Sequence, residues 1–445
     1  MNELTLEEEE FKQLLRAFMG GHTHANANYV EQVISDVWSK DFTSSYPAVM
    51  VLEKFPMSKA HLITEPMTKE VFSQLLETRA CLFDITFYDI YHKLKFEHPI
   101  SRSKCWECEG EVTDNGRIVF ADKISITVTE QDYFTYSKFY GWSKCEISNF
   151  RWYYKQYLPH EFVKAILGLY KQKTVLKGII KEEINYMISK NMLNASYGMS
   201  VTNPVRNTIE YEDDVYKSTK PCISDALDVY NKDVKRFLFY PWGVWITAYA
   251  RRNLFTAIEA IGKDFVYSDT DSIKYINEFD HRQYFEEYNK QIDEKIKKAA
   301  EYHNLEISMF SPLTQDGNVK TIGVWDDDGH YDKFKTLGAK RYMYLEDGEY
   351  HITLAGANKK STAKYLSMFN KPFDHFNRNL CIPKEYSGRL TITYIDDETS
   401  GVVVDYKGKP YHYHELSSIH MEPSEYNLTM SDEFINYLKG VREIE

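Results

Sequence analysis

Residues 265–277 read FVYSDTDSIKYIN, and this stretch decides the expected fold. Two runs of β-branched and aromatic residues flank a short acidic segment, which predicts two short strands joined by a turn. Asp269 and Asp271 lie two positions apart, so along an extended edge both carboxylates project the same way. Hard divalent cations such as Mg²⁺ and Mn²⁺ prefer such oxygen ligands. The pair therefore indicates a metal site on a sheet, although a DTD triplet by itself is typical of an ordinary turn.

A third carboxylate is expected from DFTSSYP at residues 41–47. A short strand runs toward Asp41 and Pro47 permits a helix start directly afterwards, so the segment predicts a strand, a tight turn and a helix. Tyr46 would lie beside a nucleotide, where its ring offers stacking and collides with a ribose 2′-hydroxyl. A buried Asp that caps the helix and a core Tyr explain the same segment equally well.

The segment KNMLNASYG at residues 190–198 predicts a helix with two distinct faces. Lys190, Asn194 and Tyr197 are spaced i, i+4, i+7 and share the polar face. A lysine fixed on a helix suits the phosphates of a triphosphate, and Tyr197 can stack on a base pair. An ordinary amphipathic helix with a solvated lysine is the alternative. The opposite face is apolar and consists of Ile184, Ile188, Met192 and Ala195.

Residues 159–198 predict two helices folded back as a hairpin, because the helical periodicity is interrupted near KQKTVLKG. Lys173 and Lys177 lie in that interruption and could add charge for a triphosphate. Such a hairpin is a candidate moving element.

Two further segments offer contacts to a nucleic-acid strand. KRYMY begins a predicted hairpin that turns at residues 347–348, and its Lys340 could reach a primer phosphate, with Tyr342 beside it. WITAYARR predicts a helix on which Thr247 and Arg251 face a strand. A salt-bridged surface arginine is the alternative for the second segment.

Composition sets weaker limits. The 445 residues exceed what one core usually serves, so two or more subdomains are expected, and 43% hydrophobic residues indicate a globular chain. The formal net charge of −12 argues weakly against nucleic-acid binding, but acidic blocks at 7–10 and 326–328 hold much of the excess, and these blocks are typical of solvated faces. A positive groove can therefore lie elsewhere.

The six cysteines, without a secretory leader or a long apolar run, predict a reducing, cytoplasmic setting and no membrane segment. Cys105 and Cys108 form a CxxC pair that only Cys145 and a distant His could complete as a zinc site, so ordinary thiols are favoured.

Other elements are read from local signals. Thr5 and Glu8 have capping-box spacing for a first helix that ends at Gly20-Gly21, and HTHANAN after it predicts a loop. Residues 54–158 mix short strands and helices, as an inserted module would. Toward the C-terminus, RLTITYI, GVVVDY and PYHYHEL predict strands, and a helix is expected near 432–438.

The order of DFTSSYP, KNMLNASYG, YSDTDS and KRY resembles the four polymerase motifs of family B DNA polymerases. FMGGHTHAN and PWGVWITAYAR look most like the protein-primed bacteriophage branch. The resemblance implies an α+β right-hand fold. Its parts would be an N-terminal helix and linker (1–40), palm (41–56), a terminal-protein-region-like insert (57–158), fingers (159–198), a second insert (199–239), palm (240–350), and thumb with C-terminal region (351–445).

The resemblance also implies a DNA-directed DNA polymerase that adds deoxynucleotides to a DNA 3′-hydroxyl or a terminal-protein hydroxyl by two-metal phosphoryl transfer. Two Mg²⁺ or Mn²⁺ ions would be held by catalytic Asp41, Asp269 and Asp271, with Phe42 in the ligand set. The nucleotide would contact Tyr46, Lys173, Lys177, Lys190, Asn194 and Tyr197. Primer-template DNA would contact Gly20, Gly21, Thr247, Arg251, Lys340 and Tyr342. A terminal protein and a separate exonuclease chain are further expected partners.

The sequence departs from the family pattern in three places. Ser45 stands where Leu is usual, Ala195-Ser196 replace a Ser-Leu pair, and Phe18 replaces a Tyr before the glycines. Only 40 residues precede Asp41, which leaves no room for the family's 3′-5′ exonuclease domain. The expectation is a chain without proofreading, by nature or as one piece of a longer or split protein.

Two other functions compete with this interpretation. A primase-like or RNA-synthesising polymerase would use the same carboxylates and would show relaxed sugar selection. A catalytically silent DNA-binding replication scaffold would keep the fold alone, but the presence of all three carboxylates speaks against such decay.

Overall fold

The computed structural model describes residues 3–212, 215–404 and 408–443. Small parts of three predicted regions lie outside the described residues: 1–2 of the N-terminal segment, 213–214 of the second insert, and 405–407 and 444–445 of the C-terminal region. Within the described part of the chain, no helix combines the length and the apolar character needed to cross a membrane.

A seven-stranded antiparallel sheet brings together segments from distant parts of the sequence. The predicted hairpins at FVYSDTDSIKYIN and KRYMYLEDGEYHITLAG are both present in it, and the predicted strand runs to Asp41. In order across the sheet the strands are β1 (Thr23–Ala25), β14 (Phe265–Asp269), β15 (Ser272–Tyr275), β2 (Ile34–Phe42), β16 (Trp325–Gly338), β17 (Arg341–Glu346) and β18 (Glu349–Leu354).

The prediction of a loop at HTHANAN is wrong for Thr23–Ala25, which form the edge strand β1, and a short 3-10 helix begins at Ala27. Its residue Thr23 pairs with Asp269, and Ala25 pairs with Tyr267. The strand exists because β14 offers its open edge to the backbone of a segment that precedes it by more than 240 residues. Local polarity carries no signal of that pairing.

Residues 61–153 build a second sheet, which is the core of the predicted inserted module. Its interior is apolar, with Phe83 and Phe87 of the central strand fully buried. The main strands, in spatial order, are β4 (His61–Leu62), β10 (Lys144–Tyr153), β5 (Ala80–His92), β8 (Arg117–Thr129) and β6 (Glu107–Glu109); β7 (Val112–Asp114) pairs with β8, and β9 (Tyr140–Gly141) pairs with β5.

This sheet separates the cysteines that could have formed a zinc site. Cys145 is opposite Phe87, Phe87 is opposite Ile124, and Ile124 is opposite Cys108. Three strand spacings of about 4.8 Å therefore lie between Cys145 and Cys108. Cys105 is buried and Cys108 is half-buried, and neither forms a disulfide.

Helix α8 (Tyr240–Ile261) is the central helix of the structure, and 18 of its 22 residues are buried. A helix that is apolar on all sides belongs in the interior. Its contacts come from helices on several sides, namely α2 (Ser45–Leu52), α4 (Glu130–Phe139), α6 (Glu183–Ser200) and α9 (Glu278–His303).

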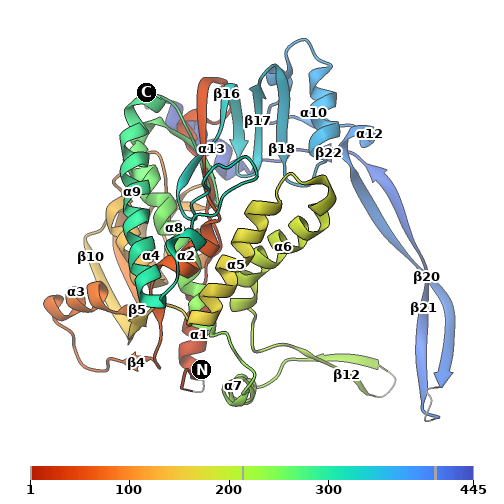
Figure 1. Cartoon of the computed structure of the whole chain (residues 1–445). Coiled ribbons are helices and arrows are strands. Elements are labelled where there is room, and N and C mark those ends of the chain that lie inside the picture. Colours follow the sequence, from red (N-terminus) through yellow and green to blue (C-terminus); the bar gives the residue numbers. More distant parts are fainter. Residues whose placement is uncertain (1–2, 213–214, 405–407, 444–445) are drawn as a thin grey trace.

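The predicted helical hairpin consists of α5 (His160–Leu176) and α6, which pack side by side and stand at one side of the structure (Figure 1). The apolar face predicted for α6 is exposed, and Ile184 keeps 76% of its surface accessible. The first helix, α1 (Glu8–Ala17), has its capping box at Glu7 and Glu10, so the expected box at Thr5 and Glu8 is wrong.

Two hairpins extend beyond the packed body of the protein (Figure 1). One is β12 (Thr208–Glu212) with β13 (Val215–Thr219). The other is β20 (Arg389–Val404) with β21 (Pro410–Ser424), so RLTITYI and the start of GVVVDY belong to one long strand. The predicted C-terminal helix is α13 (Asp432–Glu443), and it packs its Phe434 into a core with residues of the first sheet.

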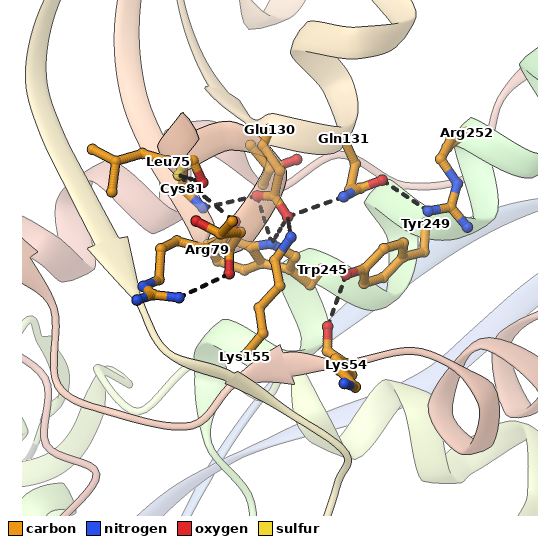
Figure 2. A network of polar contacts seen from close by, with 12 residues as sticks. Lys54, Leu75, Arg79, Cys81, Glu130, Gln131, Lys155, Trp245, Tyr249 and Arg252 are labelled. Atoms are coloured by element: carbon orange, nitrogen blue, oxygen red, sulfur yellow. Dashed lines mark hydrogen bonds and ion pairs between the residues drawn. The ribbon is translucent and has the colours of Figure 1, made fainter. Parts of the chain in front are cut away.

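One buried carboxylate joins the inserted module to the central helix (Figure 2). Glu130 at the start of α4 has no exposed surface. Its oxygens accept hydrogen bonds from the Cys81 backbone N–H at 2.8 Å and from the Trp245 indole N–H at 2.9 Å, and the Lys155 ammonium lies 2.8 Å away. Four separate segments therefore meet at one side chain.

Replacing Glu130 by Ala should lower the free energy of unfolding by about 3–5 kcal/mol, because Lys155 keeps a buried charge without a partner and two N–H donors lose their acceptor. Urea unfolding followed by circular dichroism measures the change. Glu294→Ala is the matched control, since Glu294 pairs with Lys297 on an exposed helix face and should cost less than about 1 kcal/mol. Equal effects of the two substitutions would contradict this account.

Candidate active site

The two sheet strands β14 and β15 meet at a turn that carries Asp269 and Asp271. Thr270 between them adopts a left-handed backbone with φ of 61°, which is costly for a β-branched residue. Two backbone contacts hold the turn: the Thr270 N–H donates to the His22 carbonyl at 2.6 Å, and the Phe42 N–H donates to the Asp271 carbonyl at 2.7 Å. The turn is therefore fixed from both neighbouring strands.

Asp41 is the last residue but one of β2 and lies directly opposite Ser272, so the three predicted carboxylates gather at one end of three adjacent strands. Burial raises the pKa of Asp41 to about 7, and the neighbouring Asp271 contributes in the same direction. Burial also raises the pKa of Asp271 to about 6, with a further rise from Asp269. Negative charge is thus concentrated where a hard divalent cation could be bound.

The donor set fits such a cation. Carboxylate oxygens of Asp41, Asp269 and Asp271 would hold it, since these are the oxygen ligands that Mg²⁺ and Mn²⁺ take in proteins. Phe42 could add only its main-chain carbonyl, because its ring is buried edge-on against Trp325 with centroids 5.0 Å apart.

Two lysines lie beside the carboxylates, and the sequence analysis predicted only one of them. The Lys340 ammonium lies 2.6 Å from an oxygen of Asp269, so it is at the carboxylates as expected, and it pairs with one of them. Lys274 was missed: it is 4% exposed, donates to the Ser272 hydroxyl at 2.8 Å, and has its pKa lowered by burial. Its position two residues after Ser272 on a strand places it on the same face, which period-two alternation could have revealed.

Tyr46 and Tyr197 bring two distant motifs into contact. Tyr46 lies in α2 and Tyr197 in α6, and their rings stack with centroids 4.3 Å apart and an angle of 27°. Both tyrosines are partly buried. Asn194 on α6 is exposed, three residues before Tyr197.

The predicted lysines form a positive group facing the carboxylates. The Lys173 ammonium donates to the Ser44 hydroxyl at 2.9 Å. Its pKa is lowered first by burial and then by the nearby charges of Lys190 and Lys177, while Asp41 opposes the change. A cavity of about 650 Å³ lies here, lined by Asp41, Ser44, Lys173, Lys177 and Lys320 among others. The acidic block 326–328, expected as a solvated face, also lines this cavity.

The Gly20-Gly21 segment supports the carboxylate turn. An added Cβ at Gly21 would lie 2.6 Å from the Thr270 methyl group and 3.0 Å from the Tyr46 hydroxyl. Two positions later, the Thr23 hydroxyl donates to an Asp269 oxygen at 2.9 Å. Only a residue without a side chain lets the chain pass this close to the turn.

The expected surface positions of Thr247 and Arg251 are wrong. Thr247 is completely buried, and its hydroxyl donates to the Val244 carbonyl of its own helix at 3.0 Å. Arg251 is 7% exposed and donates to Asp132 at 2.7 Å and to the Gly20 carbonyl at 3.1 Å. Both side chains are enclosed by the packing of α8, so neither faces a nucleic-acid strand.

Tyr342 lies on β17 beside Lys340 and packs against other aromatic rings. Its ring centroid is 5.0 Å from that of Tyr267 and 5.6 Å from that of Phe334. The Tyr267 hydroxyl in turn accepts a hydrogen bond from the Lys340 N–H at 3.0 Å. This aromatic group therefore fixes the backbone that presents Lys340.

Comparison with known proteins gives a consistent result. A family described as DNA polymerase type B, organellar and viral, matches residues 2–240. The DNA polymerase of Bacillus phage phi29 is 25% identical over 289 residues, and that of Bacillus phage B103 is 25% identical over 264 residues. Each alignment covers 59% of this chain and 42% of the relative, so the chain spans less than half the length of these relatives.

Solved structures show the same fold. Phi29 DNA polymerase in a post-translocation binary complex with primer-template DNA superposes with a TM-score of 0.60 at 16% identity, covering 96% of this chain and 63% of that one. Its ternary complex with primer-template DNA and incoming nucleotides gives a TM-score of 0.57 with the same identity and coverage. The right-hand polymerase fold predicted from the sequence is therefore confirmed.

Asp41→Asn should stabilise the protein at pH 8 in EDTA by about 1–2 kcal/mol, allowing for partial solvent screening. The pKa of Asp41 is raised in the folded state, so the folded state loses stability as pH rises from about 4 to about 7. The substitution removes this loss, and its benefit should shrink toward pH 4. Urea unfolding across this pH range measures the effect, and Mg²⁺ should stabilise the natural protein more than the variant. A destabilised variant at pH 8 would contradict the repulsion argument.

Gly21→Ala should lower the free energy of unfolding by about 1–3 kcal/mol, because the new methyl group collides with Thr270 and Tyr46. Gly20→Ala is the matched control: an added Cβ there meets no atom within 4 Å, so its stability should be nearly unchanged. Thermal unfolding compares the two neighbours. Equal stability of both variants would show that the close approach at Gly21 is not a constraint.

Proposed function

Since the chain belongs to the organellar and viral family of type B DNA polymerases, we propose that it is a DNA-directed DNA polymerase. It would add deoxynucleotides to a DNA 3′-hydroxyl or to the hydroxyl of a terminal protein in phage genome replication. The observation that carries the proposal is the convergence of Asp41, Asp269 and Asp271 opposite the lysines of the α5–α6 hairpin.

Each group has a task in this reaction. Two divalent cations held by the three carboxylates would activate the attacking hydroxyl and stabilise the leaving pyrophosphate. Lys173, Lys177 and Lys190 would neutralise the triphosphate, which needs positive charge opposite the carboxylates. The cavity between the two groups is large enough to admit it.

The stacked tyrosines suit the nucleotide's sugar and base. Tyr46, backed by Tyr197, would lie under the sugar and collide with a ribose 2′-hydroxyl. The stack limits how far Tyr46 can retreat, so it would exclude ribonucleotides by steric contact. Asn194, on the same helix face, would approach the nucleotide as well.

Primer and template would run past the side of the site formed by Lys340, Tyr342 and the Gly20-Gly21 segment. Lys340 neutralises Asp269 in the structure and would lie between that carboxylate and a primer phosphate. Gly21 is exposed and passes close to the turn without a side chain, so its backbone could approach the primer or template beside the carboxylates.

The two projecting hairpins would hold the duplex. Tyr211 of β12 and Tyr411 of β21 approach each other with ring centroids 6.1 Å apart, although the hairpins come from the second insert and the thumb region. This contact supports a proposal that they close around DNA. The 57–158 module would receive a terminal protein, and a separate exonuclease chain is a further proposed partner.

Extension of a labelled primer on a DNA template with Mg²⁺ tests the proposal. The natural protein should extend the primer with deoxynucleotides and poorly with ribonucleotides, and Asp271→Asn should reduce the rate at least about 100-fold by removing a metal ligand. Asp332→Asn, an exposed aspartate on β16 of the same sheet, is the control and should retain the rate. Failure to extend even with Mn²⁺ would favour a scaffold, and equal use of ribonucleotides would favour an RNA-synthesising enzyme.

A further inference from the structure

A buried group of histidines and carboxylates lies behind the carboxylate turn, between β1 and the inserted module. His22 and His24 come from the β1 segment, and Glu97 comes from the segment that follows β5. Each of these three side chains is at most 1% exposed. Within the described residues, this is the one group of His, Cys, Asp or Glu whose ligand atoms all lie within 4.8 Å of one another.

The two histidine rings face the two carboxylate oxygens of Glu97 at close range, and one of these oxygens, Oε1, also accepts a hydrogen bond from the His98 N–H at 2.7 Å. His22 Nε2 lies 3.2 Å from one Glu97 oxygen, and His24 Nδ1 lies 3.0 Å from the other. Even so, both ring nitrogens of His22, Nδ1 of His24 and Oε2 of Glu97 have no hydrogen-bond partner. Buried polar atoms without hydrogen-bond partners destabilise a folded protein, so a cluster of four calls for an explanation.

We propose that His22, His24 and Glu97 bind a structural Zn²⁺ ion. Two imidazole nitrogens and a carboxylate are ligands that Zn²⁺ accepts, whereas Mg²⁺ selects oxygen atoms. Bonds of about 2.0–2.1 Å in tetrahedral geometry place neighbouring ligand atoms about 3.3 Å apart. The observed separations of 3.2 and 3.0 Å between the histidine nitrogens and the Glu97 oxygens are close to that spacing, and the ligand atoms of all three side chains lie within 4.8 Å of one another.

The surroundings of His24 are those of a metal-bound imidazole. With Nδ1 facing Glu97, its other nitrogen, Nε2, lies 3.3 Å from the Asp114 carbonyl and 3.7 Å from the Asp114 carboxylate. Such outer carboxylates and carbonyls orient metal-binding histidines and fix their tautomer. His98 Nε2 lies 3.7 Å from the same carboxylate, which extends the network.

Charge alone does not demand the ion. Glu97 and Asp114 supply two negative charges, and Arg117, whose guanidinium acts on both His22 and His24, supplies a positive one. A bound divalent ion would add two positive charges to this group of two negative charges and one positive charge. The unpartnered nitrogens and the arrangement around His24, rather than a charge deficit, carry the assignment.

The ion would brace the reaction centre without taking part in it. Thr23, between the two histidines, donates to Asp269, and the His22 carbonyl accepts from Thr270. A metal joining β1 to Glu97 would therefore hold both contacts against the inserted module. Because the cluster is almost inaccessible to solvent, a substrate cannot reach it.

Metal content is the first test. The tag-free chain is produced in cells grown with zinc and purified in metal-depleted buffer. Inductively coupled plasma mass spectrometry should then find about one zinc ion per molecule. Glu97→Gln keeps the shape of the side chain and should retain less than about a tenth of that, as should His24→Ala. His61→Ala, an exposed histidine of β4, and Asp271→Asn at the other site should keep the full content.

Two further measurements test the ion directly, and the first of them uses only the natural chain. Removal of zinc with a chelator should lower the melting temperature of the natural chain, and Zn²⁺ but not Mg²⁺ should restore it. Co²⁺ in place of zinc should give visible absorption bands that are absent from Glu97→Gln. The proposal is overturned if the natural chain retains less than about a tenth of an equivalent after incubation with Zn²⁺ and dialysis, with an unchanged melting temperature.

Discussion

Repulsion among three carboxylates at the end of one sheet is the constraint on which the remaining structure depends. Strand pairing fixes Asp41 opposite Ser272, and the turn fixes Asp271 two residues from Asp269, so the charges cannot separate without breaking backbone hydrogen bonds. Burial is the main reason that the pKa values of Asp41 and Asp271 are raised, and the charge of a neighbouring carboxylate raises each of them further. Compensation must therefore come from fixed positive groups or from bound cations.

The structure supplies such groups from three directions. Lys274 lies in the sheet itself, Lys340 contacts Asp269 from the neighbouring hairpin, and Lys173 faces Asp41 from α5. None of the three neutralises all three carboxylates. Lys274 donates to the Ser272 hydroxyl, Lys173 donates to the Ser44 hydroxyl, and Lys340 pairs with Asp269 alone. The carboxylates can therefore still attract divalent cations, while the lysines can attract a triphosphate.

A second layer of buried polar contacts holds the turn in position. Arg251 joins the central helix to the Gly20 carbonyl and to Asp132 of the inserted module, and Glu130 joins the same module to Trp245. Buried ionic contacts of this kind add little net stability but strongly penalise any rearrangement that separates the partners. They therefore suit a role in fixing the inserted module relative to the first sheet.

The sequence predicted features that depend on local spacing and missed those that depend on distant partners. Alternation at YSDTDS and the i, i+4, i+7 spacing near Lys190 led to the correct hairpin and helix. HTHANAN was taken for a loop because its partner, β14, lies more than 240 residues away. Arg251 was taken for a surface residue for the same reason, since Asp132 is 119 residues distant.

The helices around the carboxylates differ in how many of their residues are buried. In α8, 18 of 22 residues are buried, whereas α6 buries only Ser189, Leu193 and Ser200 among its 18 residues. The apolar face of α6 is largely exposed, with Ile184 at 76% and Met192 at 54% of their surface accessible. An element with so few buried contacts opens at lower free energy than the core. Lys190 on α6 therefore lies on an element held by fewer buried contacts than the sheet that carries the carboxylates.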